Sequence, residues 1–139
     1  MVTQKLYAPE NAQEIVGQPS EVQSRQPVFS IAYDRATKEV LINDIVMLEG
    51  DGNYTFFHLS NGKRILVSRT LKQYEDALEG TSFLRVHKSF LVNLEHLVSY
   101  DLKNEMNLCF CNGAKVGVSR RKKQDVMGRL ESMRNSLAS

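Results

Sequence analysis

The sequence predicts a mostly-β fold, in which short strands are joined by tight turns and accompanied by two helices. Runs rich in branched and aromatic residues recur from Val28 onward, as is typical of strands. Glycine-containing turn dipeptides separate several of these runs. Only two segments, near residues 70–79 and 120–136, have the apolar spacing of an amphipathic helix.

Composition divides the 139 residues into a tail and one domain. Residues 1–27 are rich in Gln, Ser, Glu and Pro, and their few apolar side chains show no sustained periodicity. Such a segment buries too little apolar surface to offset the entropy lost on ordering. We therefore expect a flexible polar tail or linker over residues 1–27, available to a sensor partner, and a folded domain over residues 28–139.

The first half of the domain contains a series of predicted strands, with the sequences VFSIAY, EVLI, DIVMLEG, YTFFHL and RILVS. Asp51-Gly52 predicts a turn between the third and fourth strands, and Asn61-Gly62 predicts a β-hairpin formed by the fourth and fifth. Because the apolar and polar residues alternate imperfectly, the sequence does not decide which face of this hairpin is buried.

A short helix is predicted over residues 70–79. Ser68 or Thr70 is suited to cap its N-terminus, and Gln73 completes an approximate capping box with Thr70. Gly80 is a suitable C-terminal stop. One face is apolar and consists of Leu71, Tyr74 and Leu78. The helix is therefore expected to cover one face of a sheet.

The run FLRVHKSFLVN, residues 83–93, places His87, Lys88 and Ser89 between apolar residues. We expect a strand, a turn around Lys88 and Ser89, and a return strand. The expected core anchors are Phe83, Val86, Phe90 and Val92. Asn93 is expected to be structural, with its side chain bonded to the main chain. Taken alone, the polar trio has two interpretations, a buried histidine beside a turn-forming serine or an exposed binding surface.

Further strands are predicted by HLVSYDL, MNLCFC and AKVGVS. The turns between them are expected at Lys103-Asn104 and Asn112-Gly113. A final helix near residues 120–136 is expected to begin close to Ser119, its predicted cap. Its apolar stripe consists of Val126, Leu130, Met133 and Leu137.

Catalytic and metal-binding patterns are weak in this sequence. His58, His87 and His96 are scattered without metal-type spacing. Cys109 and Cys111 lack a second ligand pair, so they are interpreted as small, half-buried strand residues. We expect no enzyme activity, no metal and no cofactor. No run has the length of a membrane span, and no N-terminal segment has the pattern of a signal peptide, so we expect a cytoplasmic protein without membrane insertion.

Positive charge is concentrated toward the C-terminus. Residues 83–139 contain ten basic and five acidic side chains, whereas the whole chain has a net charge of only +2. This asymmetry favours a polyanionic partner. Four consecutive cations, Arg120 to Lys123, fall at the start of the predicted helix, where they oppose the helix dipole. A phosphate backbone would remove that penalty, and a solvated charged turn is the alternative.

Polar or basic residues recur at three strand boundaries, in the segments GDGNYTF, HKS and SRRKK. Together with LKQYEDAL and the string F-x-R-V-H-[RK]-S-[FY]-x-[VI]-N, they resemble the LytTR DNA-binding domain family across roughly residues 30–135. That family is the output module of LytR/AlgR-type bacterial response regulators. The resemblance implies small antiparallel sheets with few helices, and loops that enter successive major grooves of a bent duplex, usually at paired repeats.

The resemblance also implies residue roles, segment by segment. The first DNA-facing loop matches Asn53 and Tyr54, although the alignment there includes a length difference. In the second loop Lys88 occupies the main base-reading position, beside His87 and Ser89. In the third, Arg120 matches a base reader, and the residues placed nearer the phosphates are Arg121, Lys122 and Lys123.

The expected function is therefore sequence-specific binding of double-stranded DNA by a transcriptional regulator, with a homodimer on paired repeats. Two alternatives remain open. An RNA-binding β domain is suggested by the aromatic residues Tyr54, Phe56 and Phe57, which could stack on bases. A protein-interaction module without DNA binding is the other. Most members of the family carry an N-terminal receiver domain, whereas here a short polar tail precedes the domain, which indicates either a one-domain member or part of a longer protein.

Overall fold

The computed structural model describes residues 27–33 and 35–138. The predicted tail therefore lies outside the described residues, except for Pro27. The chain divides into two compact units, Met1–Ile45 and Val46–Ser139, and each is described by itself.

The described part of the first unit is a β-hairpin followed by one turn of 3-10 helix. Strands β1 (Val28–Tyr33) and β2 (Ala36–Leu41) pair in antiparallel fashion, and η1 (Ile42–Asp44) follows them. Strand β2 begins three residues before the predicted run EVLI, and Ile42 belongs to the 3-10 turn rather than to the strand.

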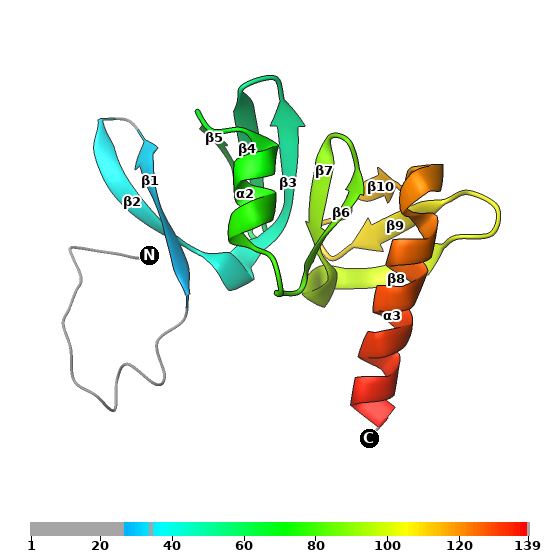
Figure 1. The fold of residues 1–139 in the computed structure, drawn as a ribbon. Coiled ribbons are helices and arrows are strands. Elements are labelled where there is room, and N and C mark those ends of the chain that lie inside the picture. The colour runs from blue at the N-terminus through cyan, green and yellow to red at the C-terminus, as the bar shows by residue number, and fades with distance from the viewer. Residues whose placement is uncertain (1–26, 34, 139) are drawn as a thin grey trace. The chain divides into compact units, whose positions relative to one another are not determined.

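The second unit contains a five-stranded sheet in the order β5-β4-β3-β7-β6 (Figure 1). Its strands are β3 (Ile45–Asp51), β4 (Tyr54–Leu59), β5 (Arg64–Val67), β6 (Phe83–His87) and β7 (Phe90–Asn93). The predicted hairpin is confirmed, because β4 pairs with β5 in antiparallel fashion and Gly62 adopts a φ of 90° in the turn. Gly52, in the turn between β3 and β4, has a φ of 62°, which favours glycine.

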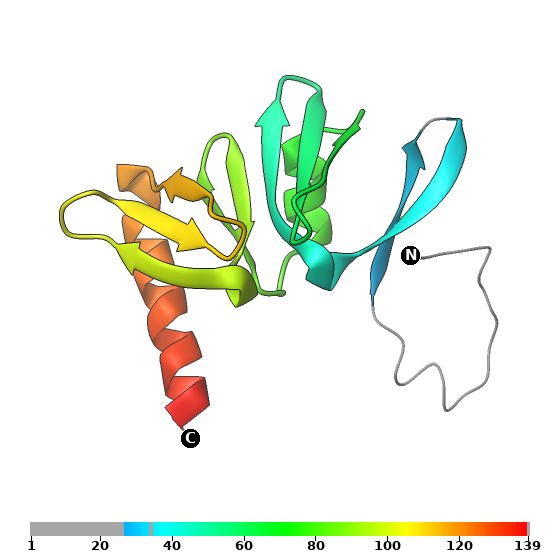
Figure 2. The same ribbon diagram turned by 180° about the vertical axis from the view of Figure 1, so that it is seen from behind.

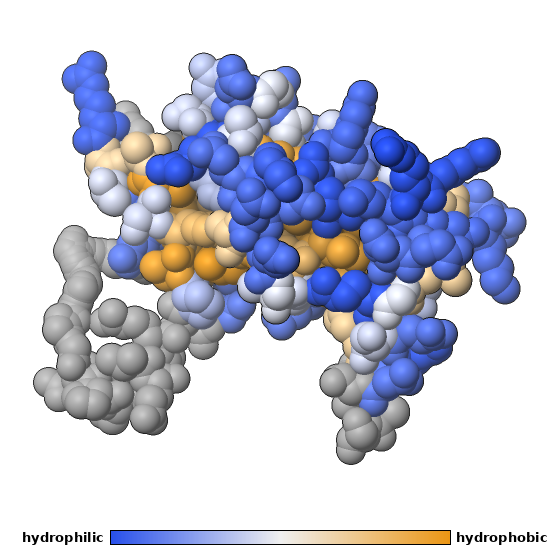
Figure 3. Space-filling view, viewed as in Figure 1, coloured by the Kyte–Doolittle hydropathy of each residue, from blue (hydrophilic) through white to orange (hydrophobic). Residues whose placement is uncertain are grey.

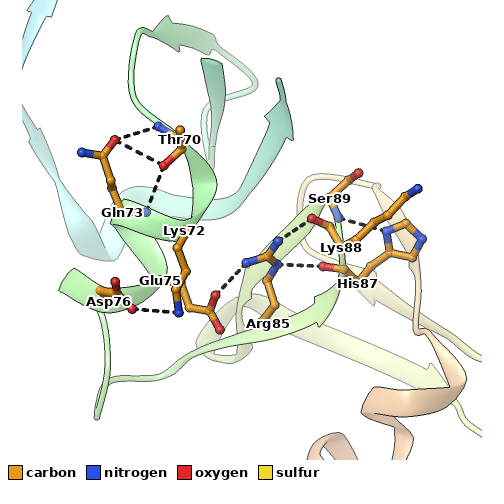
Figure 4. Close-up of polar contacts among 9 residues, drawn as sticks. All are labelled: Thr70, Lys72, Gln73, Glu75, Asp76, Arg85, His87, Lys88 and Ser89. Atoms are coloured by element: carbon orange, nitrogen blue, oxygen red, sulfur yellow. Dashed lines mark hydrogen bonds and ion pairs between the residues drawn. The ribbon is translucent and has the colours of Figure 1, made fainter. Parts of the chain in front are cut away.

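Helix α2 (Leu71–Ala77) covers one face of this sheet, as both ribbon views show (Figures 1 and 2). Thr70, not Ser68, is its N-cap, and the full capping box with Gln73 is present (Figure 4). The predicted apolar face is confirmed, since its members are all buried: Leu71, Tyr74 and Leu78. Tyr74 packs edge-on against Phe57, with ring centroids 5.0 Å apart.

Both faces of β7 are covered, which explains why the run FLVN does not alternate. Leu91, Val92 and Asn93 are all buried, whereas the expected anchor Phe90 is only half-buried. A register shift between Arg85 and His87 also breaks the alternation along β6. The other expected anchors are buried as predicted, namely Phe83, Val86 and Val92.

A three-stranded antiparallel sheet follows, in the order β10-β9-β8. The strands are β8 (Leu97–Asp101), β9 (Asn107–Phe110) and β10 (Lys115–Gly117), and η2 (Leu94–His96) connects β7 to β8. The sequence predicts β8 and β9 as a strand pair, and this pairing is confirmed. Strand β10 follows the predicted turn at Asn112-Gly113 and pairs with β9 in antiparallel fashion. Cys109 is half-buried, but Cys111 lies beyond the end of β9 and is exposed, so its expected burial is wrong.

The C-terminal helix α3 (Lys123–Ala138) begins later than predicted. A 3-10 turn, η3 (Arg120–Lys122), precedes it, and Ser119 stands before that turn without a side-chain capping bond to any described residue. Val126 is fully buried in the apolar cluster to which both sheets contribute, and Leu130 and Met133 are partly buried against this cluster. The side chain of Leu137 lies outside the described part. Among the helices of residues 27–33 and 35–138, none is long and apolar enough to cross a membrane.

Candidate nucleic-acid interface

The turn between β6 and β7 presents Lys88 to solvent. Lys88 is exposed, while His87 and Ser89 on either side are half-buried. The Ser89 amide donates to Nδ1 of His87 at 3.1 Å, which requires an unprotonated Nδ1. A neutral His87 therefore carries its proton on Nε2. Its ring also lies beside Phe90, with centroids 5.9 Å apart.

Arg85 supports this turn from β6 (Figure 4). Its Nε donates to the carbonyl of His87 at 2.9 Å, and its Nη2 donates to the carbonyl of Lys88 at 2.5 Å. The third bond joins Nη1 to Oε1 of Glu75, on α2, at 2.6 Å. One guanidinium thus connects two consecutive carbonyls of the turn to the helix that covers the sheet.

The first predicted loop lies beside this turn because β3 pairs with β7. The amide of Gly50 donates to the carbonyl of Ser89 at 2.8 Å, directly before the β3–β4 turn. Asn53 and Tyr54 are both exposed there, and half of the Tyr54 surface is accessible. This loop contains no cation and one exposed acid, Asp51. It is therefore suited to hydrogen bonding rather than to charge neutralisation.

The third segment is attached to the same strand that leads into the β6–β7 turn. The amide of Ser119 donates to the carbonyl of Val86 at 2.9 Å. Arg120 and Arg121 are exposed, whereas Lys122 and Lys123 are half-buried. Because η3 contains the first three cations, only Lys123 belongs to the α-helix itself. The expected repulsion between these cations and the helix dipole is accordingly smaller. Asp125 in the first turn of α3 interacts favourably with that dipole.

Two main-chain hydrogen bonds, Gly50 to Ser89 and Ser119 to Val86, thus bring all three predicted segments together. In both ribbon views the β3–β4 turn, the β6–β7 turn and the start of α3 lie at the same end of the second unit (Figures 1 and 2). The space-filling view shows strongly hydrophilic side chains projecting near the β6–β7 turn and the start of α3 (Figure 3). The result is one polar surface with several cations.

The aromatic residues behind the RNA-binding alternative do not share an exposed surface. Phe57 is fully buried, and the half-buried ring of Phe56 lies under the Arg64 guanidinium, 4.4 Å from its centroid. Only Tyr54 is exposed. Because base stacking needs accessible ring faces, these three residues do not form a stacking platform.

Sequence reasoning assigned no role to Arg85 or to Glu75. The available signal was an arginine inside an apolar strand, since such a residue is rarely buried without a partner. The expected structural role of Asn93 is confirmed, because its Oδ1 accepts from Ser82 Oγ at 2.7 Å and from the Glu95 amide at 3.1 Å. Within residues 27–33 and 35–138, no three His, Cys, Asp or Glu side chains come together as a metal site.

Comparison with known proteins now adds a family to this geometry. The model of the LytTR family, described as the LytTr DNA-binding domain, matches residues 35–131. A solved structure from Bacillus cereus, the LytTr DNA-binding domain of a putative methyl-accepting/DNA response regulator, superposes with a TM-score of 0.65. The alignment covers 76% of this chain and 98% of that chain, and at 22% sequence identity it shows the fold alone.

Two curated relatives are the heme-containing CO-sensing transcriptional regulators RcoM 2 and RcoM 1 of Paraburkholderia xenovorans (strain LB400). They are 36% identical over 73 residues and 34% identical over 77 residues, which is 51% and 54% of this chain. The matched stretch spans only 27% and 28% of those relatives. The family match itself covers most of the described second unit, and on that ground the chain belongs to the LytTR DNA-binding domain family.

Proposed function

We propose that this chain is a transcriptional regulator that binds double-stranded DNA sequence-specifically, with its three loop segments entering successive major grooves. The observation that carries the proposal is the pair of main-chain bonds that unites the three segments, Gly50 to Ser89 and Ser119 to Val86. A single isolated basic turn would fit many solvated surfaces. Three polar segments held at one end of a sheet, two of them basic, fit a duplex better.

The exposed cations suit the two kinds of contact that specific DNA binding requires. Lys88 and Arg120 are both exposed and are the proposed base readers, since Lys and Arg donate to guanine O6 and N7. The proposed phosphate contacts are Arg121, Lys122 and Lys123, with hydrogen bonds from Asn53, Tyr54, His87 and Ser89. The bond from Ser89 uses Nδ1 of His87, so the Nε2–H group takes no part in it and can donate to a phosphate oxygen.

The experiment selects duplexes bound by the protein from a random or genomic library, and then titrates the selected duplex. Lys88→Ala should weaken binding by about 1–3 kcal/mol, or roughly 5- to 150-fold, and relax discrimination at one base pair. Lys63→Ala is the matched control, because Lys63 is an exposed lysine in the β4–β5 turn, at the far end of β4. Equal affinities of parent and Lys88→Ala for every duplex would contradict the assignment of the second loop.

A competition experiment tests the choice of nucleic acid. Single-stranded RNA should displace the selected duplex poorly, because the ring of Phe57 is inaccessible. Affinity for the duplex should fall steeply with salt, as expected for several phosphate contacts. Efficient displacement by RNA would favour the RNA-binding alternative.

We further propose that two protomers bind a pair of repeats. Duplexes that carry one or two copies of the selected motif would distinguish the stoichiometries in sedimentation. A complex of one protomer on the two-copy duplex at saturating protein would contradict this part of the proposal.

A further inference from the structure

The β6–β7 turn is fixed by bonds from two sides. On one side Arg85 donates to the carbonyls of His87 and Lys88. On the other side the Gly50 amide donates to the carbonyl of Ser89. Within the turn, the Ser89 amide donates to the His87 ring. The main chain of Lys88 therefore has little freedom, although the Lys88 side chain is exposed.

We propose that Arg85 is a positioning residue for DNA recognition, and that Glu75 on α2 orients it. In this arrangement Arg85 does not contact DNA. It holds the Lys88 main chain in one conformation, so that the Lys88 ammonium group meets a particular base pair without an entropy cost for ordering the turn. This inference rests on the proposed function, because it assigns a role within the same DNA-binding surface.

The chemistry of the three bonds requires an arginine. The guanidinium offers donors in a fixed fork, and here Nε, Nη1 and Nη2 each meet a different acceptor. A lysine has the same charge but a single flexible ammonium group, which cannot reproduce the three directions. Arg85→Lys therefore removes the geometry and keeps the charge.

Glu75 provides a second, independent test because its charge has the opposite sign. Glu75 anchors the guanidinium from α2, and its side chain is 30% exposed against 19% for Arg85. Removing a carboxylate near a DNA-binding surface should strengthen binding to any duplex if only net charge matters. If orientation of Arg85 matters, Glu75→Ala should instead reduce the discrimination between duplexes. Alanine is favourable within a helix, so α2 itself should persist.

A suitable control exists elsewhere in the same unit. Arg129 on α3 also donates to a main-chain carbonyl, from Nη2 to the oxygen of Thr81, at 2.6 Å. Thr81 follows α2, at the opposite end of that helix from its N-cap, and precedes β6, whose other end leads into the β6–β7 turn. Arg129→Lys thus makes the same chemical change, at a bond that does not involve the turn.

The first measurement needs no DNA and uses the full chain. Amide hydrogen exchange of Ser89 reports whether the turn is ordered, because that amide donates to His87. Arg85→Lys should speed exchange at Ser89 by about tenfold or more, a local opening that loses one or two hydrogen bonds. Glu75→Ala should give a smaller increase, and Arg129→Lys should give none at this amide. Unchanged exchange at Ser89 in both Arg85→Lys and Glu75→Ala would overturn the inference.

The second measurement is a double-mutant cycle on DNA. Discrimination is the ratio of Kd values for the selected duplex and a duplex with one changed base pair. Arg85→Lys should reduce that ratio by about tenfold, and by no more than Lys88→Ala does, since it acts through the same contact. In the Lys88→Ala background, Arg85→Lys should change the ratio by less than about twofold.

The outcomes separate the inference from the proposed function. The positioning role would be overturned if Arg85→Lys reduced the Kd ratio by the same factor with and without Lys88→Ala. It would also be overturned if Glu75→Ala bound all duplexes more tightly and kept full discrimination. A parent protein that binds all duplexes equally would refute the proposed function alone. In that case the exchange rate of Ser89 still decides whether Arg85 orders the turn.

Discussion

Asn93 lies at the junction of β7 and η2, and its replacement by alanine should destabilise the second unit. Asn93 is 1% exposed, and its Oδ1 accepts two hydrogen bonds, from Ser82 Oγ and from the Glu95 amide. Alanine would leave both donors without this acceptor, at a position that is buried from water. Each lost bond costs about 1 kcal/mol, and the vacated volume adds to it, so Asn93→Ala should cost about 2–4 kcal/mol.

A loss of this size is measurable in a domain of this length. It corresponds to a fall in Tm of roughly 8–32 °C, at about 4–8 °C for each kcal/mol. The chain contains no tryptophan, so urea unfolding is best followed by far-UV circular dichroism. The midpoint should shift while the denaturant slope stays constant.

Asn61→Ala provides the control for burial. The Oδ1 atom of Asn61 accepts from the Lys63 amide at 2.9 Å, two residues ahead, just as Asn93 accepts from Glu95. Asn61 is exposed, so water replaces the lost acceptor and the cost should stay below about 1 kcal/mol. Equal losses for the two variants, or a loss below about 1 kcal/mol for Asn93→Ala, would refute the argument that burial makes this residue essential to the fold.

Further predictions concern DNA binding, packing and pH. Arg120→Ala should relax discrimination at one base pair, whereas Lys123→Ala should weaken binding to all duplexes alike and reduce the salt slope by about 1 in titrations at several salt concentrations. Gly50→Ala should cost about 1 kcal/mol in urea unfolding, because the new Cβ would lie 3.1 Å from the Cβ of buried Leu71; an unchanged midpoint would contradict the packing. Burial raises the pKa of the Tyr74 hydroxyl above its ordinary 10.0, so its contribution to stability is complete below pH 10 and is lost as pH rises through the folded-state pKa. Tyr74→Phe should therefore show a shallower alkaline loss of stability, and identical pH profiles would argue against it.

Short-range features of the fold were predictable because they depend on neighbouring residues. The capping box of Thr70 and Gln73 spans three residues, and the positive φ at Gly62 satisfies the turn that its dipeptide predicted. Such interactions form within one turn or one hairpin. They are therefore readable from a window of sequence without knowledge of what packs against it.

The start of α3 and the anchors around the β6–β7 turn were less predictable. Ser119 has a good capping residue type, but its amide is bonded to Val86 and the chain makes a 3-10 turn before the helix begins. The burial of both Leu91 and its neighbour Val92 follows from the cover on both faces of β7. Periodicity assumes one buried face, so it fails where a strand is buried on both.

The sequence by itself determined the mostly-β class, the hairpins and the three segments that are candidates for DNA contact, because composition and turn chemistry are local. Only the tertiary structure decided that these segments meet, through main-chain hydrogen bonds from Gly50 to Ser89 and from Ser119 to Val86. Main-chain groups are the same in every residue, so the sequence pattern does not indicate which of them pair over a long range. It also revealed the partners of Arg85. An arginine in an apolar strand requires partners, but only the folded chain shows that these are Glu75 and the carbonyls of the turn that presents Lys88.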